Sequence, residues 1–194
     1  MLAVAAWLGS SLGALAGPAV PTFSQRSAQW SRQALGSDRV DTIGSAGCAL
    51  TAVTMVTAAY GYSTNPGTLN RWLTANGGYL ENDLLLWRQA AAATQGTVRW
   101  KWLHVPGMAP QLRTDDQDVN DAPTAAIAER ELDSGNLVVA EVRLYGGMHF
   151  VVLTSHHGES FSINDPWFAD QSTLNRRYGA YASAVYSAQV YYRS

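Results

Sequence analysis

The sequence has little cysteine and little charge, and both shortages limit what the protein can be. Cys48 is the only cysteine, so no intramolecular disulfide can form. Charged residues make up 14% of the chain, the formal net charge is −2, and no run of basic side chains occurs. A nucleic-acid partner is therefore not expected, because such a partner needs a basic surface. No internal repeat is visible, so a repeat architecture is not expected either.

A long apolar run is also missing, apart from the first residues. Residues 1–15 are apolar and uncharged, and residues 14–18 (Ala-Leu-Ala-Gly-Pro) suit a signal-peptidase site, although a basic n-region is absent. The run is shorter than a typical membrane span. We therefore expect residues 1–19 to be a signal peptide, with a retained N-terminal anchor or an ordinary buried helix as alternatives. The protein would then be secreted or held at the cell surface, with membrane contact only through this segment.

Residues 20–194 are expected to form one α+β domain. A chain of 194 residues is long enough for a single domain with a substantial core. Apolar residues at helical spacing, with capping residues at the ends, predict helices over 45–60, 65–77, 82–91 and 123–135. Alternating patterns predict strands over 98–102, 137–142, 149–154, 161–165 and 181–192. A helical half that packs on an antiparallel β half is typical of the α+β class.

Cys48 stands where the first long helix is expected to begin. Ser45 is a natural N-cap, and one buried stripe follows at helical spacing: Ala49, Val53, Val56 and Tyr60. In the first turn, unpaired amides and the positive end of the helix dipole favour a thiolate over a thiol. Gly47 would leave room for a substrate backbone to approach the sulfur. The alternative is a small cysteine buried in the core.

A predicted β-hairpin in the second half supplies partners for this thiol. Because side chains alternate along a strand, His149 and Asp165 lie on the apolar faces of their strands, which come together in the hairpin. Their separation, 165 − 149 = 16, centres the hairpin on residue 157, so the two residues would lie roughly opposite, within ~5.5 Å at the backbone. A thiol, an imidazole base and a group that orients the base are what a cysteine hydrolase needs. The alternative is an ordinary strand start and an ordinary strand-ending turn.

Other polar residues are weighed for the same site. Gln25 is a candidate for an oxyanion hole, because its amide and the Cys48 backbone N–H would supply two donors; the alternative is an ordinary polar residue. A zinc site built from His104, His156 and His157 lacks a further ligand, and the acidic segment 106–121 lacks the glycine and distal glutamate of an EF-hand. We therefore expect no metal and no cofactor.

Taken together, the motifs resemble a known family. They are Val20-Pro21-x-Phe23-x-Gln25, Trp30, Gly47-Cys48-Ala49-Leu50-Thr51-Ala52, Met55, Tyr60-Gly61, Asp133-Ser134-Gly135-Asn136, Gly147-Met148-His149-Phe150-Val151-Val152-Leu153 and Ile163-Asn164-Asp165-Pro166. In this order they resemble a papain-like cysteine peptidase, a free-standing member of the family related to bacteriocin double-glycine leader peptidases. The resemblance covers most of the chain from Val20 to about Trp167.

The resemblance implies a fold, a set of roles and an activity. The fold would be papain-like, with Cys48 as nucleophile, His149 as its base, Asp165 as the orienting residue and Gln25 in the oxyanion hole, although papain-like enzymes commonly place this glutamine closer to the cysteine. The implied activity is hydrolysis of a peptide or amide bond through a Cys48 thioester, with a peptide or peptidoglycan peptide as substrate. The alternatives are a cell-wall amidase, an acyl transferase on the same fold, or a non-catalytic peptide-binding module. Four tryptophans would line the cleft or pack in the core: Trp30, Trp100, Trp102 and Trp167.

Overall fold

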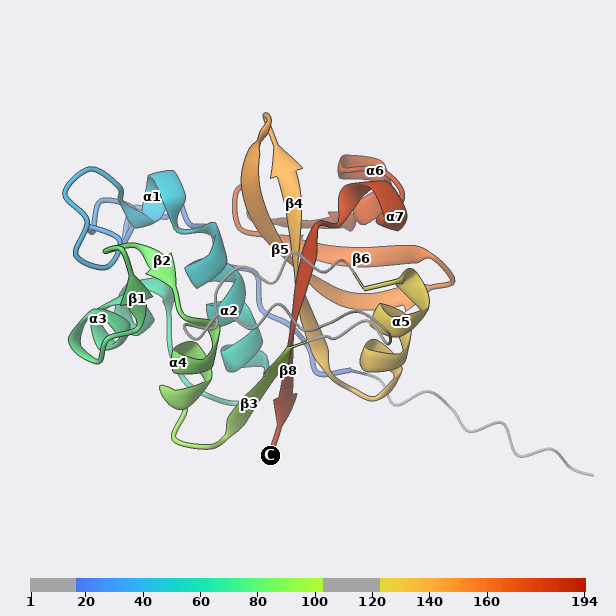
Figure 1. Cartoon of the computed structure of the whole chain (residues 1–194), viewed down its shortest axis with the longest axis horizontal. Helices are drawn as coiled ribbons and strands as arrows, with labels where there is room; N and C mark the ends of the chain where they lie inside the picture. Colours follow the sequence, from blue (N-terminus) through green and yellow to red (C-terminus); the bar gives the residue numbers. More distant parts are fainter. Residues whose placement is uncertain (1–16, 103–122) are drawn as a thin grey trace, which may run out of the picture.

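The computed structural model describes residues 17–102 and 123–194 (Figure 1). The predicted signal peptide or anchor lies outside the described residues up to residue 16, and so do His104, the acidic segment 106–121 and the side chain of Trp102. Within the described ranges, no helix combines the length and the apolar character needed to cross a membrane.

The first half of the domain is helical. In chain order its elements are α1 (Ile43–Ala46), α2 (Cys48–Ala59), α3 (Pro66–Ala75), β1 (Tyr79–Leu80), β2 (Leu84–Leu85) and α4 (Trp87–Ala92). The α2 sequence, CALTAVTMVTAA, contains no charged residue because the helix is buried on almost every side. The start of α3 is as predicted: the Asn65 side chain accepts a hydrogen bond from the Thr68 N–H, and Pro66 is the first helical residue.

The second half is built on an antiparallel sheet of six strands. They are β3 (Val98–Trp102), β4 (Leu137–Leu144), β5 (Gly147–His157), β6 (Ser160–Asp165), β7 (Asp170–Thr173) and β8 (Ser187–Arg193). Their order across the sheet is β3-β8-β4-β5-β6-β7, so the last strand lies between the first two in sequence. This order places β5 and β6, which carry the candidate site residues, beside each other in the sheet.

Helices cover both faces of the sheet (Figure 1). One face packs on α2 and α4, with Val139 and Val152 in that core. The other packs on α5 (Ala125–Asp133), α6 (Leu174–Arg177) and α7 (Tyr181–Ala184), with Val138 and Val151 in that core. Neighbouring residues of one strand thus enter different cores, which explains why these strands are apolar at successive positions. The α+β prediction is confirmed, and so is the packing of a helical N-terminal half on an antiparallel sheet.

The start of the long helix differs in one respect from the prediction. Thr42 caps the short helix α1, and the Ser45 hydroxyl accepts a hydrogen bond from the Thr42 N–H in a capping box. Helix α2 then begins at Cys48, with Gly47 at the junction and no side-chain cap. Cys48 is therefore in the first turn, as predicted, but the prediction that Ser45 caps this helix is wrong.

The segment predicted as a helix over 82–91 is a hairpin followed by a shorter helix. β1 and β2 pair with each other, and α4 begins only at Trp87. Glu81 and Asn82 have positive φ angles of 50° and 84°, which form the tight turn and are incompatible with a helix starting there. Leu84, whose spacing from Trp87 and Ala91 suggested a helix, belongs instead to the second strand of this hairpin.

The end of the chain also departs from the prediction of a strand over 181–192. Residues 181–184 form α7, and the strand begins at Ser187. Tyr181, Ala184 and Val185 are buried, and their spacing of three and four residues is that of a helix. The sequence pattern did not predict the short elements β7 and α6. β7 pairs with β6 at the edge of the sheet, and α6 packs against β6.

The segment before α1 crosses to the β half of the molecule. Asn164 Nδ2 donates hydrogen bonds to the carbonyl oxygens of Val20 and Pro21, at 3.0 and 3.2 Å. The backbone N–H of Gln25 donates to the carbonyl oxygen of Pro166 at 3.0 Å. These bonds attach the segment to the end of β6 and thereby place Gln25 near the first turn of α2.

Candidate active site

Cys48 lies at the N-terminus of α2, at the boundary between the helical and β halves. Its side chain is 9% exposed, and its only hydrogen-bond acceptor within the described part of the chain, apart from His149, is the carbonyl oxygen of Ala46, 3.9 Å from Sγ. Gly47 has a reason other than the predicted access for substrate: a Cβ there would lie 2.5 Å from the Ile43 carbonyl oxygen. The glycine is needed because α1 and α2 approach so closely at this junction.

The β5–β6 hairpin brings His149 and Asp165 together, although not in the predicted register. Val152 pairs with Asn164, so the two candidate residues lie diagonally rather than directly opposite each other. Diagonal neighbours on one face of a sheet remain within reach of long side chains. His149 Nε2 lies 2.9 Å from Asp165 Oδ1, and the residues are 3% and 0% exposed.

A β-bulge in β5 gives these two residues a common face. Near the turn, Ser155 pairs with Ser162, a register that sets odd-numbered residues of β5 opposite even-numbered residues of β6. Continued along the hairpin, that register would put His149 and Asp165 on opposite faces. The register shifts by one residue between Leu153 and Ser155, which restores the common face.

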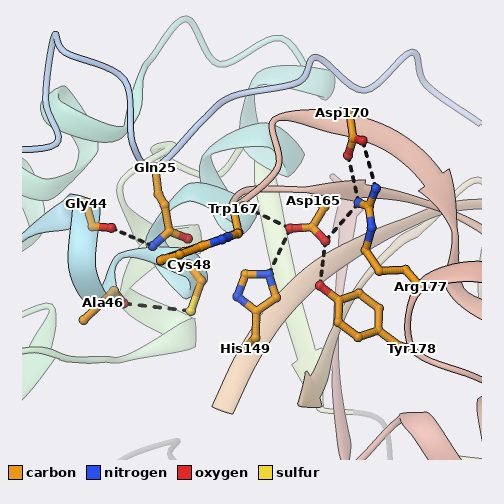
Figure 2. Close-up of polar contacts among 10 residues, drawn as sticks. All are labelled: Gln25, Gly44, Ala46, Cys48, His149, Asp165, Trp167, Asp170, Arg177 and Tyr178. Atoms are coloured by element: carbon orange, nitrogen blue, oxygen red, sulfur yellow. Dashed lines mark hydrogen bonds and ion pairs between the residues drawn. The ribbon is translucent and has the colours of Figure 1, made fainter. Parts of the chain in front are cut away.

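The imidazole connects the carboxylate to the thiol (Figure 2). One ring nitrogen of His149 bonds to Asp165, and the other points toward Cys48. Burial alone would lower the pKa of His149, but the hydrogen bonds to Asp165 and Cys48 outweigh burial and raise it to about 9. At neutral pH the ring beside the sulfur is therefore an imidazolium.

The carboxyl group of Asp165 is held in its charged form. Burial would raise the pKa of Asp165, but hydrogen bonds from His149, Tyr178 and the Trp167 backbone N–H, together with the charge of the imidazolium, lower it below its ordinary value. Both shifts have the direction expected for a buried ion pair of Asp165 and His149.

Gln25 lies at the same site, despite its distance from Cys48 in sequence. Its side chain is 1% exposed, and Nε2 donates a hydrogen bond to the carbonyl oxygen of Gly44 at 3.2 Å. Oε1 is buried and has no hydrogen-bond partner among the described residues. The amide nitrogen carries a second N–H, which the bond to Gly44 leaves available to a ligand in the site.

Gln25, Cys48 and His149 border a cavity of about 450 Å³ between the two halves. Its walls come from α1, the first turn of α2, β2, α4, the β4–β5 hairpin and the segment after β6. The lining residues are Gln25, Leu35, Ser45, Ala46, Cys48, Ala49, Asp83, Leu84, Leu85, Trp87, Leu144, Tyr145, Met148, His149, Phe150 and Trp167. Most of these side chains are apolar, so the cavity suits a chain segment with apolar side chains rather than a small charged molecule.

Of the remaining candidate residues in the described part of the chain, Trp167 borders the cavity and the others lie elsewhere. His156 is at the turn end of β5 and bonds to Asp133 at 3.0 Å, away from the cavity. Trp167 lines the cavity, whereas Trp30 is buried in the core and Trp100 donates a hydrogen bond to Gln189. In residues 17–102 and 123–194, no group of three or more His, Cys, Asp or Glu side chains is arranged to hold a metal ion.

The fold and the arrangement of these residues define a class. A cysteine at the head of a buried helix, facing a histidine and an aspartate on an antiparallel sheet, is the architecture expected for a papain-like cysteine peptidase. The model of the Peptidase C39-like family matches residues 19–194, and the chain belongs to that family. The resemblance inferred from the motifs is thus confirmed at the level of the family.

The fold is also found among solved structures, of which four chains match. One is the crystal structure of a candidate C39-like peptidase from Bacillus anthracis, with 13% sequence identity and a TM-score of 0.50. The similarity covers 90% of this chain and 95% of that one. At this identity the match supports the fold alone. A search of the curated proteins gives no match.

The sequence analysis did not identify the residues that hydrogen-bond to the second carboxylate oxygen of Asp165, Oδ2. Tyr178 and Arg177 bond to Oδ2 of that carboxylate, and Asp170 bonds to Arg177. They follow Asp165 by only 13, 12 and 5 residues, but the chain reverses twice between them through β7 and α6. In the sequence, Arg177 and Tyr178 belong to no strand or helix pattern that would place them beside β6. The sequence therefore contains no usable signal for them.

Proposed function

We propose that the protein is a cysteine peptidase that cleaves a peptide or amide bond with Cys48, His149 and Asp165. The observation that carries this proposal is the position of the His149 ring, with one nitrogen on the Asp165 carboxylate at 2.9 Å and the other toward the thiol (Figure 2). A base that contacts the nucleophile and is itself oriented by a third group is the arrangement needed for nucleophilic catalysis.

The reaction follows from the protonation states. In the resting enzyme the Cys48 proton already lies on His149, and the thiolate attacks the carbonyl carbon of the scissile bond to form a tetrahedral oxyanion. His149 then gives its proton to the leaving nitrogen, the carbon–nitrogen bond breaks, and a thioester on Cys48 remains. Water attacks the thioester, His149 takes a proton from it, and the carbon–sulfur bond breaks, which releases the acid and restores the thiolate–imidazolium pair. Asp165 keeps the ring oriented and its charged form stable throughout.

Gln25 is proposed to stabilise the oxyanion with its amide, together with the Cys48 backbone N–H. Gln25→Ala should lower kcat by about 100- to 1,000-fold with little change in KM, because an oxyanion donor acts mainly in the transition state. Steady-state kinetics checks this. Gln29→Ala is the matched control, since Gln29 is an exposed glutamine of the same segment. Equal effects of the two changes would remove Gln25 from the mechanism.

The pH dependence of activity follows from the raised pKa of His149. The imidazolium persists at neutral pH and is lost as the pH rises through about 9, so kcat/KM should fall on the alkaline side near pH 9. The contribution that the raised pKa of His149 makes to stability is complete below the ordinary pKa of 6.5 and is lost as the pH rises from there through about 9. A pH profile of kcat/KM in which the alkaline limb lies near 7 would contradict the proposed pair.

The substrate class is tested by turnover of defined compounds. The apolar cavity predicts a peptide with an apolar side chain next to the scissile bond. A peptide library, a muropeptide and a peptide with an added amine acceptor are compared by mass spectrometry, with the Cys48→Ala protein as control. Cleavage of plain peptides supports a peptidase, whereas release from the muropeptide alone or transfer to the amine identifies an amidase or an acyl transferase.

A non-catalytic peptide-binding module is the remaining alternative. Its thiol would react with iodoacetamide only at alkaline pH, as an ordinary cysteine does. The proposed thiolate–imidazolium pair predicts rapid alkylation of Cys48 at mildly acidic pH, and absence of such labelling would favour the binding module. Export remains a prediction from residues 1–19, and mass spectrometry of the mature N-terminus tests it.

A further inference from the structure

We infer that Tyr178 and Arg177 are positioning residues, which hold Asp165 in the orientation that bonds to His149. This inference rests on the proposed function, because it concerns the same site. It does not follow from the sequence motifs, since neither residue belongs to them. It comes from the contacts of the carboxylate.

Each oxygen of Asp165 has two hydrogen-bond donors (Figure 2). Oδ1 lies 2.9 Å from His149 Nε2 and accepts from the Trp167 backbone N–H at 3.0 Å. Oδ2 accepts from the Tyr178 hydroxyl at 2.6 Å and from Arg177 Nη1 at 3.1 Å. Hydrogen bonds to a charged acceptor are strong and directional, so the two donors on Oδ2 oppose rotation of the carboxylate. They thereby keep Oδ1 directed at the imidazole.

Arg177 is itself fixed in place. Its two terminal nitrogens, Nη1 and Nη2, each lie 2.8 Å from an oxygen of Asp170, a bidentate pair. The guanidinium also stacks 4.4 Å from the centre of the Phe168 ring. Its side chain is only 17% exposed, which is low for an arginine. A surface arginine paired only with Asp170 would need neither the stacking contact nor the approach to Asp165.

Tyr178 contributes its hydroxyl from the end of the same short helix. Its backbone N–H donates to the Leu174 carbonyl at 2.7 Å, and Leu174 is fully buried against the sheet. The Tyr178 ring centre lies 6.2 Å from that of His149. Burial and the charge of Asp165 raise the pKa of Tyr178, so the hydroxyl keeps its proton and remains a donor. One short helix therefore presents both donors to Oδ2.

The charged and titratable groups that contact this carboxylate are His149 from β5, Arg177 from α6 and Tyr178 beyond it. Cys48 from α2 interacts with His149, and Asp170 from β7 is paired with Arg177. If the two residues position Asp165, loss of a donor on Oδ2 has two consequences. It raises the pKa of Asp165, because the hydrogen bond from Tyr178 lowers that pKa. It also frees Oδ1 to leave the imidazole, so the pKa of His149 falls from about 9 toward its ordinary value.

The test uses the full chain and needs no substrate. The ring of His149 is titrated by NMR, and the pH profile of iodoacetamide alkylation of Cys48 is recorded, in Tyr178→Phe and Arg177→Met proteins. In each variant the pKa of His149 should fall by about one pH unit or more, and alkylation should require a pH higher by a similar amount. Arg177→Lys, which keeps a charge and a donor, should restore part of both shifts.

Two matched controls separate positioning from general damage. Tyr181→Phe removes the hydroxyl of a nearby buried tyrosine that has no hydrogen-bond partner among the described residues. Arg176→Met removes the exposed arginine next to Arg177 in α6. Both controls should titrate and react like the unmodified protein. The inference fails if they shift as far as the two test variants do, or if the pKa of His149 stays unchanged or rises in Tyr178→Phe.

The outcomes also distinguish this inference from the proposed function. If no peptide or amide is turned over but the two variants shift His149 as described, the positioning role stands and the hydrolase proposal fails. If substrates are cleaved but the variants titrate like the unmodified protein, the hydrolase proposal stands and Tyr178 and Arg177 only support the fold. With an active enzyme, the variants should lower kcat more than they change KM, because the orientation of the base acts in the chemical step.

Discussion

Replacing Cys48 with serine is expected to lower kcat by at least ~10,000-fold while the fold remains intact. The two side chains differ in one atom, but a hydroxyl gives up its proton far less readily than a thiol, so the attacking anion is lost. The serine hydroxyl fits the space of the thiol and can bond to the same neighbour, the Ala46 carbonyl oxygen 3.9 Å from Sγ, so stability should change little. Kinetics and the midpoint of urea unfolding are the two measurements.

The same loss of activity is expected for His149→Ala, at a modest cost in stability. After the change, Asp165 still accepts hydrogen bonds from Tyr178, Arg177 and the Trp167 backbone N–H, so the buried carboxylate keeps three donors. The free energy of unfolding should fall by about 1–3 kcal/mol. His156→Ala is the matched control, because His156 lies on the same strand and also bonds to an aspartate, Asp133. Activity that survives in His149→Ala would exclude this histidine as the base.

Local rules were sufficient to place Cys48 in the sequence analysis. An apolar stripe at helical spacing marks α2, and the short, small residues before it mark the helix start, although not the separate helix α1. The end of α1 at Ala46 and the restart at Cys48 could not be predicted, because this break depends on the close contact of Gly47 with the Ile43 carbonyl oxygen, which would lie 2.5 Å from a Cβ at Gly47. Such a contact between consecutive helices has no periodic signature.

The pairing of His149 with Asp165 was predicted correctly in its outcome and wrongly in its register. An even separation in sequence gives a common face only in a regular hairpin, but the register around the turn is odd. The bulge between Leu153 and Ser155 compensates for the odd register. Neither leucine nor serine is specific to a bulge, so the shift in register between Leu153 and Ser155 is visible only in the structure.

Contacts made by irregular segments were beyond prediction. Gln25 reaches the site because Asn164 holds the preceding carbonyls and Pro166 accepts its N–H, contacts between residues about 140 positions apart. Arg177 and Tyr178 reach it because β7 turns back beside β6 and α6 then packs against β6. The sequence therefore predicts the residues on regular elements, whereas the groups that orient them come from connections whose path is set by tertiary packing.

Asp165→Asn is expected to damage activity less than loss of Cys48 or His149, with kcat lowered by about 100- to 10,000-fold. An asparagine fits the space, but its two ends differ: one accepts and the other donates hydrogen bonds. If its oxygen faces His149, its NH₂ group meets the guanidinium of Arg177, which can only donate. If its oxygen faces Tyr178 and Arg177, the NH₂ group meets His149 Nε2 and favours the tautomer that carries its proton on the nitrogen facing Cys48, which cannot accept the thiol proton.

Either arrangement of the asparagine also removes the negative charge that stabilises the imidazolium. The pKa of His149 should therefore fall from about 9, and the alkaline limb of kcat/KM should move to lower pH with it. Asp133→Asn is the control, because it alters the other Asp–His pair of β5, whose 3.0 Å contact with His156 lies far from Cys48 along the strand. Undiminished activity in Asp165→Asn, with the alkaline limb in place, would remove Asp165 from the mechanism and leave it a purely structural carboxylate.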